Sequence, residues 1–249
     1  MAKLKFGRAN AKVVALQRKM KGKVYTFDTL SGYACPFAHN CLSKAVVGPD
    51  GKRHIKDGPH TLFRCFSASQ EALFTNVYNA RKANFDALRG LSSNEMRQTI
   101  VANLPFDAKI IRIHVAGDFF NQANFDAWLA VAKQYPHILF YAYTKSLPYW
   151  VARLDVIPTN FVLTASEGGR RDDLIVAYNL RFVRVVGSVY QARKAKLPID
   201  HDDSHAAKSG GNFALLIHGS QPAGSAMSKA KQKLKGKGSY SRKLKNKGK

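Results

Sequence analysis

Short apolar segments that alternate with amphipathic segments between residues 23 and 217 constrain the fold of this chain more than any other feature. Six of the apolar segments have the length and residue types of β-strands, and they span residues 23–30, 110–115, 138–144, 161–165, 181–186 and 213–217. Strands that alternate with helices in this way form a parallel sheet with right-handed crossovers. We therefore expect an α/β fold, built either as a partial (β/α) barrel or as an open, doubly wound sheet.

Helix-start signals place several of the segments between these strands. Ser67 and Gln70 have the spacing of a capping box, and they predict a helix from residue 67 to residue 88. Ser92 and Glu95 repeat this spacing and predict a shorter helix that runs toward Leu104. Further helices are expected over residues 122–135, 150–154 and 172–180.

The positive charge of the chain is concentrated at its two ends. The formal net charge is +24, residues 1–23 contain eight Lys or Arg, residues 227–249 contain ten, and neither end contains an acid. Most of this sequence holds too little apolar surface to offset the entropy of ordering, although Val13 and Leu16 suit a partly ordered helix. We expect a basic flexible arm, an α/β body with a polar cysteine loop, and a basic disordered tail, over residues 1–22, 23–222 (loop 31–65) and 223–249, respectively.

The basic tail predicts contact with nucleic acid, because each phosphate that a cation neutralises releases a condensed counterion. The side chains expected to make this contact are Lys229, Lys231, Lys233, Lys235, Lys237, Arg242, Lys243, Lys245 and Lys247. A solubilising tail is the plainer alternative. An anionic membrane surface is a weaker one, since the tail lacks the apolar stripe of an interfacial helix.

Composition excludes several classes of protein. The hydrophobic fraction of 45% excludes disorder over most of the chain. No run of about 18 apolar residues predicts a transmembrane helix, and the basic N-terminus lacks the apolar segment of a signal peptide. Three cysteines, an odd number, argue against a disulfide scaffold and for a reducing cytoplasm. A phosphate-binding P-loop, a dinucleotide fingerprint and a Gly-x-Ser-x-Gly elbow are all absent.

The three cysteines, Cys35, Cys41 and Cys65, all fall in the segment after the first strand. Three unrelated buried cysteines are the plain interpretation, but their clustering favours a metal or a cluster. Zinc would take the three thiolates and a histidine as fourth ligand, with His39, His54 or His60 as candidates. A [4Fe–4S] cluster would take the three thiolates and leave one iron open. The spacing alone leaves both possibilities standing.

Polar side chains also follow three later strands, where the chemistry of parallel α/β folds is located. They are Gly117 and Asp118 after the second strand, Lys145 after the third, and Ser166 with Glu167 after the fourth. We expect all of them near the cysteine loop, because the carboxyl ends of parallel strands meet at one edge of a sheet.

Three segments carry a resemblance to known proteins: Ser31-Gly-Tyr-Ala-Cys-Pro with the following Cys41, His114-Val-Ala-Gly-Asp-Phe119 and Phe140-Tyr-Ala-Tyr-Thr-Lys145. They resemble a family of phage and plasmid proteins known as a numbered phage gene product, over roughly residues 23–220. A cysteine trio after the first strand of a partial barrel also resembles the radical-SAM superfamily. That resemblance implies a partial barrel, a [4Fe–4S] cluster on the trio, and S-adenosylmethionine on the open iron.

The same resemblance implies roles for the strand-end residues. A carboxylate at Asp118 would meet the cofactor's ammonium group, and Glu167 would meet its ribose or another polar group. Gly117, Lys145 and Ser166 would complete the cofactor site. The chain departs from the superfamily in its cysteine spacing, which is C-x5-C-x23-C in place of C-x3-C-x2-C, and its Gly-Gly-Glu segment is matched only in part. Cluster binding is therefore better supported than cofactor cleavage.

Other polar groups have weaker patterns. Asp200, His201, Asp202, Asp203 and His205 are dense enough to hold a divalent cation, although a solvated polar loop explains them slightly better. His114 lies inside an apolar strand and is expected to be a core histidine. Lys145 with Arg170 and Arg171 would make the rim of the site basic, as a phosphate-bearing substrate needs, unless these are ordinary surface charges.

These observations favour an iron–sulfur enzyme of phage origin that acts on nucleic acid or is tethered to it, with Asp118 and Glu167 as the catalytic candidates. A non-catalytic nucleic-acid-binding iron–sulfur protein of phage replication or regulation is the alternative. A metal-dependent nuclease that uses residues 200–205 is a further alternative.

Overall fold

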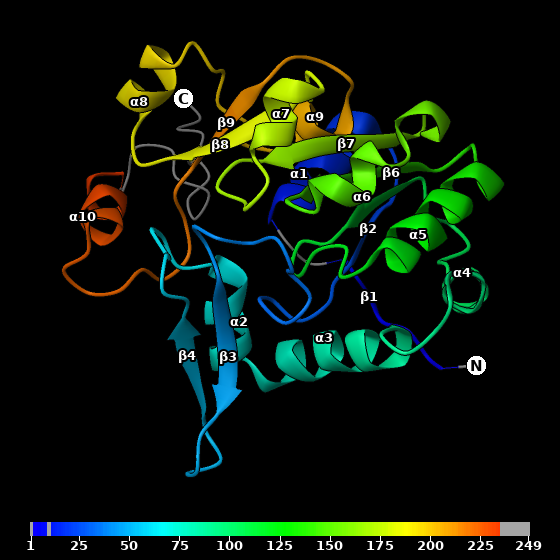
Figure 1. Ribbon diagram of the computed structural model, residues 1–249, viewed down its shortest axis with the longest axis horizontal. Coiled ribbons are helices and arrows are strands. Elements are labelled where there is room, and N and C mark those ends of the chain that lie inside the picture. The colour runs from blue at the N-terminus through cyan, green and yellow to red at the C-terminus, as the bar shows by residue number, and fades with distance from the viewer. Residues whose placement is uncertain (1, 9–10, 235–249) are drawn as a thin grey trace, which may run out of the picture.

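A mainly parallel sheet of seven strands forms the centre of the computed structural model, which describes residues 2–8 and 11–234 (Figure 1). Its strands lie in the order β1 (Phe6–Gly7), β2 (Val24–Phe27), β5 (Ile110–Ile113), β6 (Leu139–Thr144), β7 (Phe161–Ser166), β8 (Phe182–Val186) and β9 (Phe213–Leu216). The strands from β2 to β9 are parallel and adjacent in chain order, and β1 pairs antiparallel with β2. Each predicted strand is present, so the expected α/β class is confirmed.

Helices cover both faces of this sheet. They are α1 (Ala11–Met20), α2 (Phe66–Leu73), α3 (Thr75–Leu88), α4 (Ser93–Ala102), α5 (Gln122–Gln134), α6 (Leu147–Val151), α7 (Asp173–Ala177), α8 (Val189–Lys194), α9 (Ser204–Ala207) and α10 (Ala226–Lys233), with a 3-10 turn at Leu154–Val156. Helices α4 and α5 pack on one face, where Ile111 and Ile113 of β5 are buried. Helices α1 and α9 pack on the other, where Ile110 is buried. The alternation follows from the two-residue period of a strand.

The segment 67–88 is helical as predicted but forms two helices, because Phe74 is extended and separates α2 from α3. A side chain from another element explains the break. Nε of Arg53 donates to the carbonyl of Glu71 at 2.8 Å, and Nη2 of Arg53 donates to the hydroxyl of Thr75 at 2.7 Å. The carbonyl of Glu71 is the one that Thr75 would use in a continuous helix. Helix α2 also begins earlier than predicted, with Cys65 as its N-cap.

The predicted polar loop over residues 31–64 contains an antiparallel hairpin that the sequence analysis missed. Strands β3 (Ser43–Val47) and β4 (Arg53–Asp57) pair with Ser43 opposite Asp57, and the hairpin extends away from the main sheet (Figure 1). Its strands are short and carry Lys, Arg and His, so their apolar alternation is weak. Helix α2 packs against both strands.

The basic ends are more ordered than predicted within the described residues. The expected N-terminal arm supplies β1 and α1, and α1 buries Val13 and Leu16 against the sheet. The beginning of the expected disordered tail forms α10, and the next residue, Leu234, is 4% exposed. Burial of the apolar residues Val13, Leu16 and Leu234 therefore accompanies regular structure in these segments despite their positive charge. No helix among the described residues is long and apolar enough to cross a membrane.

The capping box at the start of α4 is confirmed and allows a direct test. The hydroxyl of Ser92 accepts from the backbone N–H of Glu95, whose carboxylate accepts from the backbone N–H of Ser92 at 2.8 Å. We expect Ser92→Ala to lower the free energy of unfolding by about 1 kcal/mol, because a donor of the first turn loses its partner. Ser93→Ala, one residue later, is the control and should change it by less than about 0.5 kcal/mol in denaturant titration.

Candidate functional site

A cavity of about 1310 Å³ lies at the carboxyl ends of the parallel strands, and Cys35, Cys41 and Cys65 all line it. Residues that follow β5, β6 and β9 also line it, together with Thr26, Arg112 and Tyr143 on the sheet face that packs against α1 and α9. Small-molecule sites usually measure roughly 300–1,000 Å³. The cavity therefore has room for a ligand of nucleotide size.

The first part of the cysteine loop is tied to the end of β7. The backbone N–H of Asn40 donates to the carbonyl of Gly168 at 2.9 Å, and that of Arg170 donates to the carbonyl of Phe37 at 2.9 Å. Ala38 forms an isolated bridge with Gly169. These bonds hold Cys35 and Cys41 next to the strand end where Ser166 lies.

Different elements position Cys65. Its backbone N–H donates to the hydroxyl of Ser43 at 3.3 Å, and the preceding residue, Arg64, exchanges two hydrogen bonds with the side chain of Gln221 after β9. The hydroxyl of Ser67 donates to the carbonyl of Val115 at 3.2 Å. The start of α2 is thus fixed to β3, β5 and β9 together, which brings a distant cysteine to the same cavity as the other two.

Gly117 is required by the close approach of the loops after β2 and β5. Its φ is +79°, and a Cβ at this position would lie 2.0 Å from Oγ1 of Thr29. The backbone N–H of Thr29 donates to the carbonyl of Ala116 at 3.0 Å, so the two loops are bonded at this point. The role of Gly117 shown by the geometry is to let these loops meet.

The three cysteines are half-buried, and desolvation of the sulfur atoms raises the pKa of each thiol. For Cys35 the charges of Asp118, Cys65 and Cys41 raise the pKa further, so the thiols lie within electrostatic reach of one another. Burial raises the pKa of Cys41, although the charge of Lys145 opposes this. Burial and Cys41 raise the pKa of Cys65 to about 11. The thiols are therefore neutral near pH 7, and binding a metal as thiolates would release protons.

Asp118 is buried and its carboxylate is occupied by partners within the chain. It accepts from the hydroxyl of Thr144 at 2.6 Å, from the backbone N–H of Lys145 at 2.8 Å and from that of Phe119 at 2.8 Å. Burial raises its pKa to about 6, against these three donors. Asp118 joins the ends of β5 and β6 in the wall of the cavity.

Lys145 joins the ends of β6 and β7 in the same way. Its ammonium group donates to the carbonyl of Ser166 at 2.7 Å, to the hydroxyl of Ser166 at 2.9 Å and to the carbonyl of Glu167 at 2.5 Å. Both Lys145 and Ser166 line the cavity. Glu167 does not, because its carboxylate forms an ion pair with Arg184, and Nη2 of Arg184 lies 2.7 Å from it.

The possible cation site over residues 200–205 is used inside the fold. Asp200 accepts from the backbone N–H groups of Asp202, His205 and Ala206 at 3.0–3.2 Å. Asp203 is fully buried and forms ion pairs with Arg112 at 2.5 Å and Lys12 at 2.6 Å. The solvated loop favoured from the sequence is therefore correct only in part, since His201 and His205 are exposed but Asp200 and Asp203 are buried.

The histidines named as possible zinc ligands do not line the cavity with the thiols. His39 stacks on His60 with ring centroids 4.6 Å apart, and His54 pairs with Asp50. Within residues 2–8 and 11–234, no three His, Cys, Asp or Glu side chains are placed so that they could hold a metal ion as they stand. His114 is buried as expected, but it also lines the cavity, and neither of its ring nitrogens has a hydrogen-bond partner among the described residues. Burial lowers its pKa to about 3.

The predicted basic groups are dispersed. Arg171 pairs with Asp173 on the surface, and neither Arg170 nor Arg171 lines the cavity. Lys229, Lys231 and Lys233 lie on α10. The remaining residues predicted to contact nucleic acid lie outside the described part of the chain, and they are Lys235, Lys237, Arg242, Lys243, Lys245 and Lys247.

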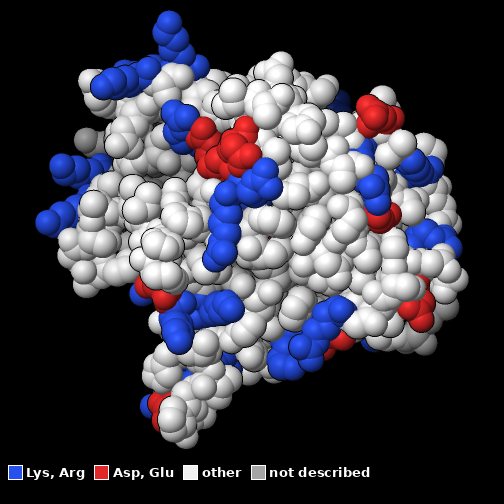
Figure 2. Space-filling model, viewed as in Figure 1, with Lys and Arg blue, Asp and Glu red and all other residues white. Residues whose placement is uncertain are grey.

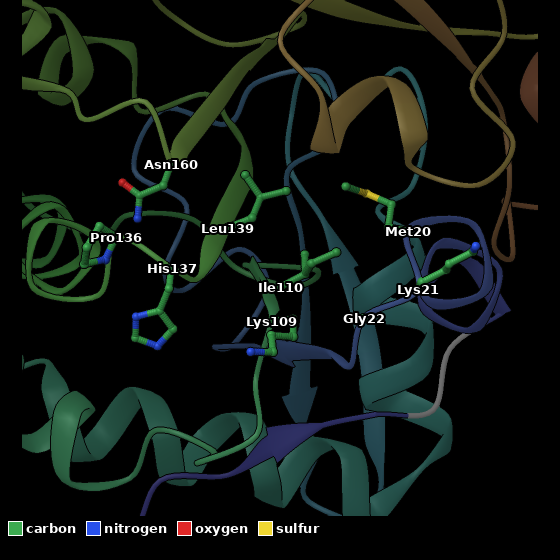
Figure 3. Close-up of a pocket in the computed structure, with 9 residues that line it drawn as sticks. All are labelled: Met20, Lys21, Gly22, Lys109, Ile110, Pro136, His137, Leu139 and Asn160. Carbon is green, nitrogen blue, oxygen red and sulfur yellow. The ribbon is translucent and has the colours of Figure 1, made fainter.

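A second, smaller pocket of about 410 Å³ lies at the amino ends of the strands, between Met20, Ile110 and Leu139 (Figure 3). Its polar side chains are Lys21, Lys109, His137 and Asn160, and none of the predicted site residues belongs to it.

Arg112, which was not predicted as a site residue, lines the cavity with the cysteines, and its guanidinium donates to Asp203. The signal was an arginine inside the apolar strand Ile110-Ile-Arg-Ile113. A charged side chain there needs a buried partner of opposite charge. The hydroxyls of Tyr141 and Tyr143 also donate to Asp203, each at 3.1 Å.

Comparison with known proteins gives one family. The family model described as Gene product 88 matches residues 2–237, which is nearly the whole chain. A search of curated proteins and a search of solved structures gave no match.

Proposed function

The chain belongs to the Gene product 88 family, and from the site that its residues build we propose that it is an iron–sulfur protein. Cys35, Cys41 and Cys65 would hold a [4Fe–4S] cluster in the cavity that they line. The observation that carries the proposal is that three cysteines spread over 31 residues of sequence line one cavity. Thiolates are the ordinary protein ligands of such clusters.

The donor set fits a cluster better than zinc. A structural zinc site takes four protein ligands, and the three histidines named from the sequence, His39, His54 and His60, lie outside the cavity, although other histidines line it. A cubane cluster on three thiolates needs no fourth side chain and leaves one iron for a ligand in the cavity. The thiols would have to come closer together around a cluster, because no three of the described His, Cys, Asp or Glu side chains are placed to hold a metal ion as they stand. The metal-dependent nuclease is disfavoured, since Asp200 and Asp203 are occupied within the fold.

The residues present do not fit S-adenosylmethionine in the way that the resemblance implied. Asp118 already accepts three hydrogen bonds from the chain, and Glu167 is paired with Arg184 away from the cavity. We therefore do not propose either carboxylate as a contact of that cofactor. The proposal keeps the partial barrel, which is supported by six parallel strands adjacent in chain order. It covers the cluster and an unidentified small molecule in the cavity, with no step through that cofactor.

The chain's own residues would prepare the site for the cluster. Lys145, whose charge lowers the pKa of Cys41, would favour its thiolate form. The Asp118 and Lys145 bonds hold the ends of β5, β6 and β7 together around the thiols. Once bound, a cluster supplies one-electron chemistry and an open iron site.

The experiment is anaerobic purification of the full chain, followed by iron, sulfide and zinc analysis and a visible spectrum. We expect a brown protein with about four irons and four sulfides per chain. Cys35→Ser, Cys41→Ser and Cys65→Ser should each lose most of the iron, because each removes one of three thiolate ligands.

Tyr33→Phe is the matched control from the same loop, since it removes only a hydroxyl that donates to the carbonyl of Ala45. It should keep its iron. A colourless native chain that retains one zinc per molecule would contradict the proposal, and so would iron content that survives loss of any one cysteine.

A further inference from the structure

The apolar sides of helices α8 and α10 both pack into one apolar cluster beside β8 and β9. Ala192 of α8 and Leu234, which follows α10, are buried in one apolar cluster, and Met227 and Ala230 of α10 pack against it. A Cβ on Gly187, just before α8, would lie 3.1 Å from the Cβ of Ala230. The apolar residues of both helices are therefore directed inward, which leaves their other faces to solvent.

Those outer faces are basic and carry a large aromatic side chain. Tyr190, Arg193 and Lys194 are exposed on α8, and their i, i+3, i+4 spacing places them on one face of the helix. Tyr190 is 72% exposed. Lys229 and Lys233 are exposed on α10 with i, i+4 spacing. Figure 2 shows Lys and Arg side chains along the upper left of the molecule, where Figure 1 places α8 and α10.

No carboxylate interrupts this surface in sequence. Residues 174–199 and 204–249 contain no Asp or Glu, and residues 235–249 add seven more Lys or Arg. Elsewhere on the molecule, exposed cations such as Lys82, Arg171 and Arg184 have acidic partners. The two stretches without acidic residues thus cover α8, α10 and the sequence that follows them.

We propose that this surface binds single-stranded nucleic acid, with Tyr190 stacking on a base and Arg193, Lys194, Lys229 and Lys233 contacting phosphates. Cations that follow a phosphate backbone beside an exposed aromatic ring are the usual means of binding unpaired strands. An aromatic ring adds nothing to contact with the phosphates of a duplex, whose bases are stacked inside.

An anionic membrane is the other surface that attracts such a patch, and the packing disfavours it. Interfacial helices need an apolar face to insert among lipids. In α8 and α10 the apolar residues Val189, Ala192, Met227 and Ala230 are engaged in the interior cluster. The inference does not depend on the cluster proposed above, since it uses none of the cavity residues.

The test is fluorescence anisotropy of the full chain with labelled oligothymidylate and oligouridylate, between about 50 and 200 mM salt. Tyr190→Ala should weaken binding at least about fivefold with little change in salt slope, because one stacking contact is lost. Tyr190→Phe keeps the ring and should bind like the native chain. In the double variant Arg193→Gln with Lys194→Gln, the slope of log K against log salt should become less steep by about 1.4, or 0.7 per phosphate contact.

Lys56→Gln with Lys133→Gln is the control pair, because it removes two exposed cations from β4 and α5 and leaves the surface intact. It should leave the slope unchanged. Three results would overturn the proposal: native affinity in Tyr190→Ala, an unchanged slope in the Arg193 and Lys194 variant, or a native chain that binds phosphatidylserine vesicles but neither oligonucleotide.

Discussion

Asp203→Asn is expected to lower the free energy of unfolding by about 3–5 kcal/mol, because it leaves two buried cations without their carboxylate. Arg112 lies 2.5 Å and Lys12 lies 2.6 Å from Asp203, and the carboxylate is fully buried. Tyr141 and Tyr143 donate to the same carboxylate, so four side chains depend on Asp203 as their acceptor. Urea titration of the native chain and the variant at pH 7 measures the difference.

Asp202→Asn is the matched control. Asp202 pairs with Lys19 at 3.2 Å on the partly exposed side of the same segment, so its loss should cost less than about 1 kcal/mol. Equal losses in the two variants would contradict the expected role of Asp203.

The loss in Asp203→Asn should also depend on pH. Burial alone would raise the pKa of Asp203, but Arg112 and Lys12 hold it well below its usual value. A carboxyl group with a lowered pKa in the folded chain stabilises the fold fully above its unfolded pKa, about 3.9, and less as pH falls below it. The difference between native chain and variant should therefore be largest above about pH 4 and shrink in more acidic solution.

Gly117→Ala is expected to destabilise the fold by about 4 kcal/mol. A left-handed backbone costs a residue with a side chain roughly 1–3 kcal/mol, and overpacking adds roughly 1–3 kcal/mol. The new methyl group would lie 2.0 Å from Oγ1 of Thr29, and 3.1 Å from both Cβ and the carbonyl oxygen of Thr29. Thermal and denaturant unfolding of the full chain measure the loss.

Gly224→Ala separates the two causes, because Gly224 has a φ of +74° with nothing within 4 Å of its Cβ position. It should cost about 1 kcal/mol, from the backbone alone. The double variant Gly117→Ala with Thr29→Ala removes the clashing hydroxyl and should recover part of the loss. Equal costs at positions 117 and 224 would show that the approach of Thr29 is unimportant.

Features that depend on neighbouring residues were predictable from the sequence. The six strands and the capping box of α4 follow from local residue types and spacing, and the structure places them where these signals stand. The rule that strand ends meet at one edge also worked, since Gly117, Asp118, Lys145 and Ser166 line the same cavity as the cysteines.

Features that depend on distant side chains were not predictable. The pairing of Arg112 with Asp203 spans 91 positions of sequence, and the break at Phe74 depends on Arg53 from the hairpin. The sequence also placed Glu167 at the correct strand end but carried no sign that Arg184, one strand along, would turn its carboxylate outward. The position of a residue after a strand determines the edge of the sheet at which it lies. The direction of its side chain depends on the partner with which it forms hydrogen bonds.

The contact between Lys12 and Asp203 has a consequence for how the chain matures on the ribosome. The strands β2, β5, β6, β7, β8 and β9 lie side by side in the order in which they are synthesised, so the sheet can add one strand at a time. Helix α1 is synthesised early, but Lys12 cannot pair with Asp203 until that residue, 191 positions later, has been synthesised. We therefore expect nascent chains that end before residue 203 to keep the amino-terminal helix loosely held, and late emergence of that carboxylate to lock it in place.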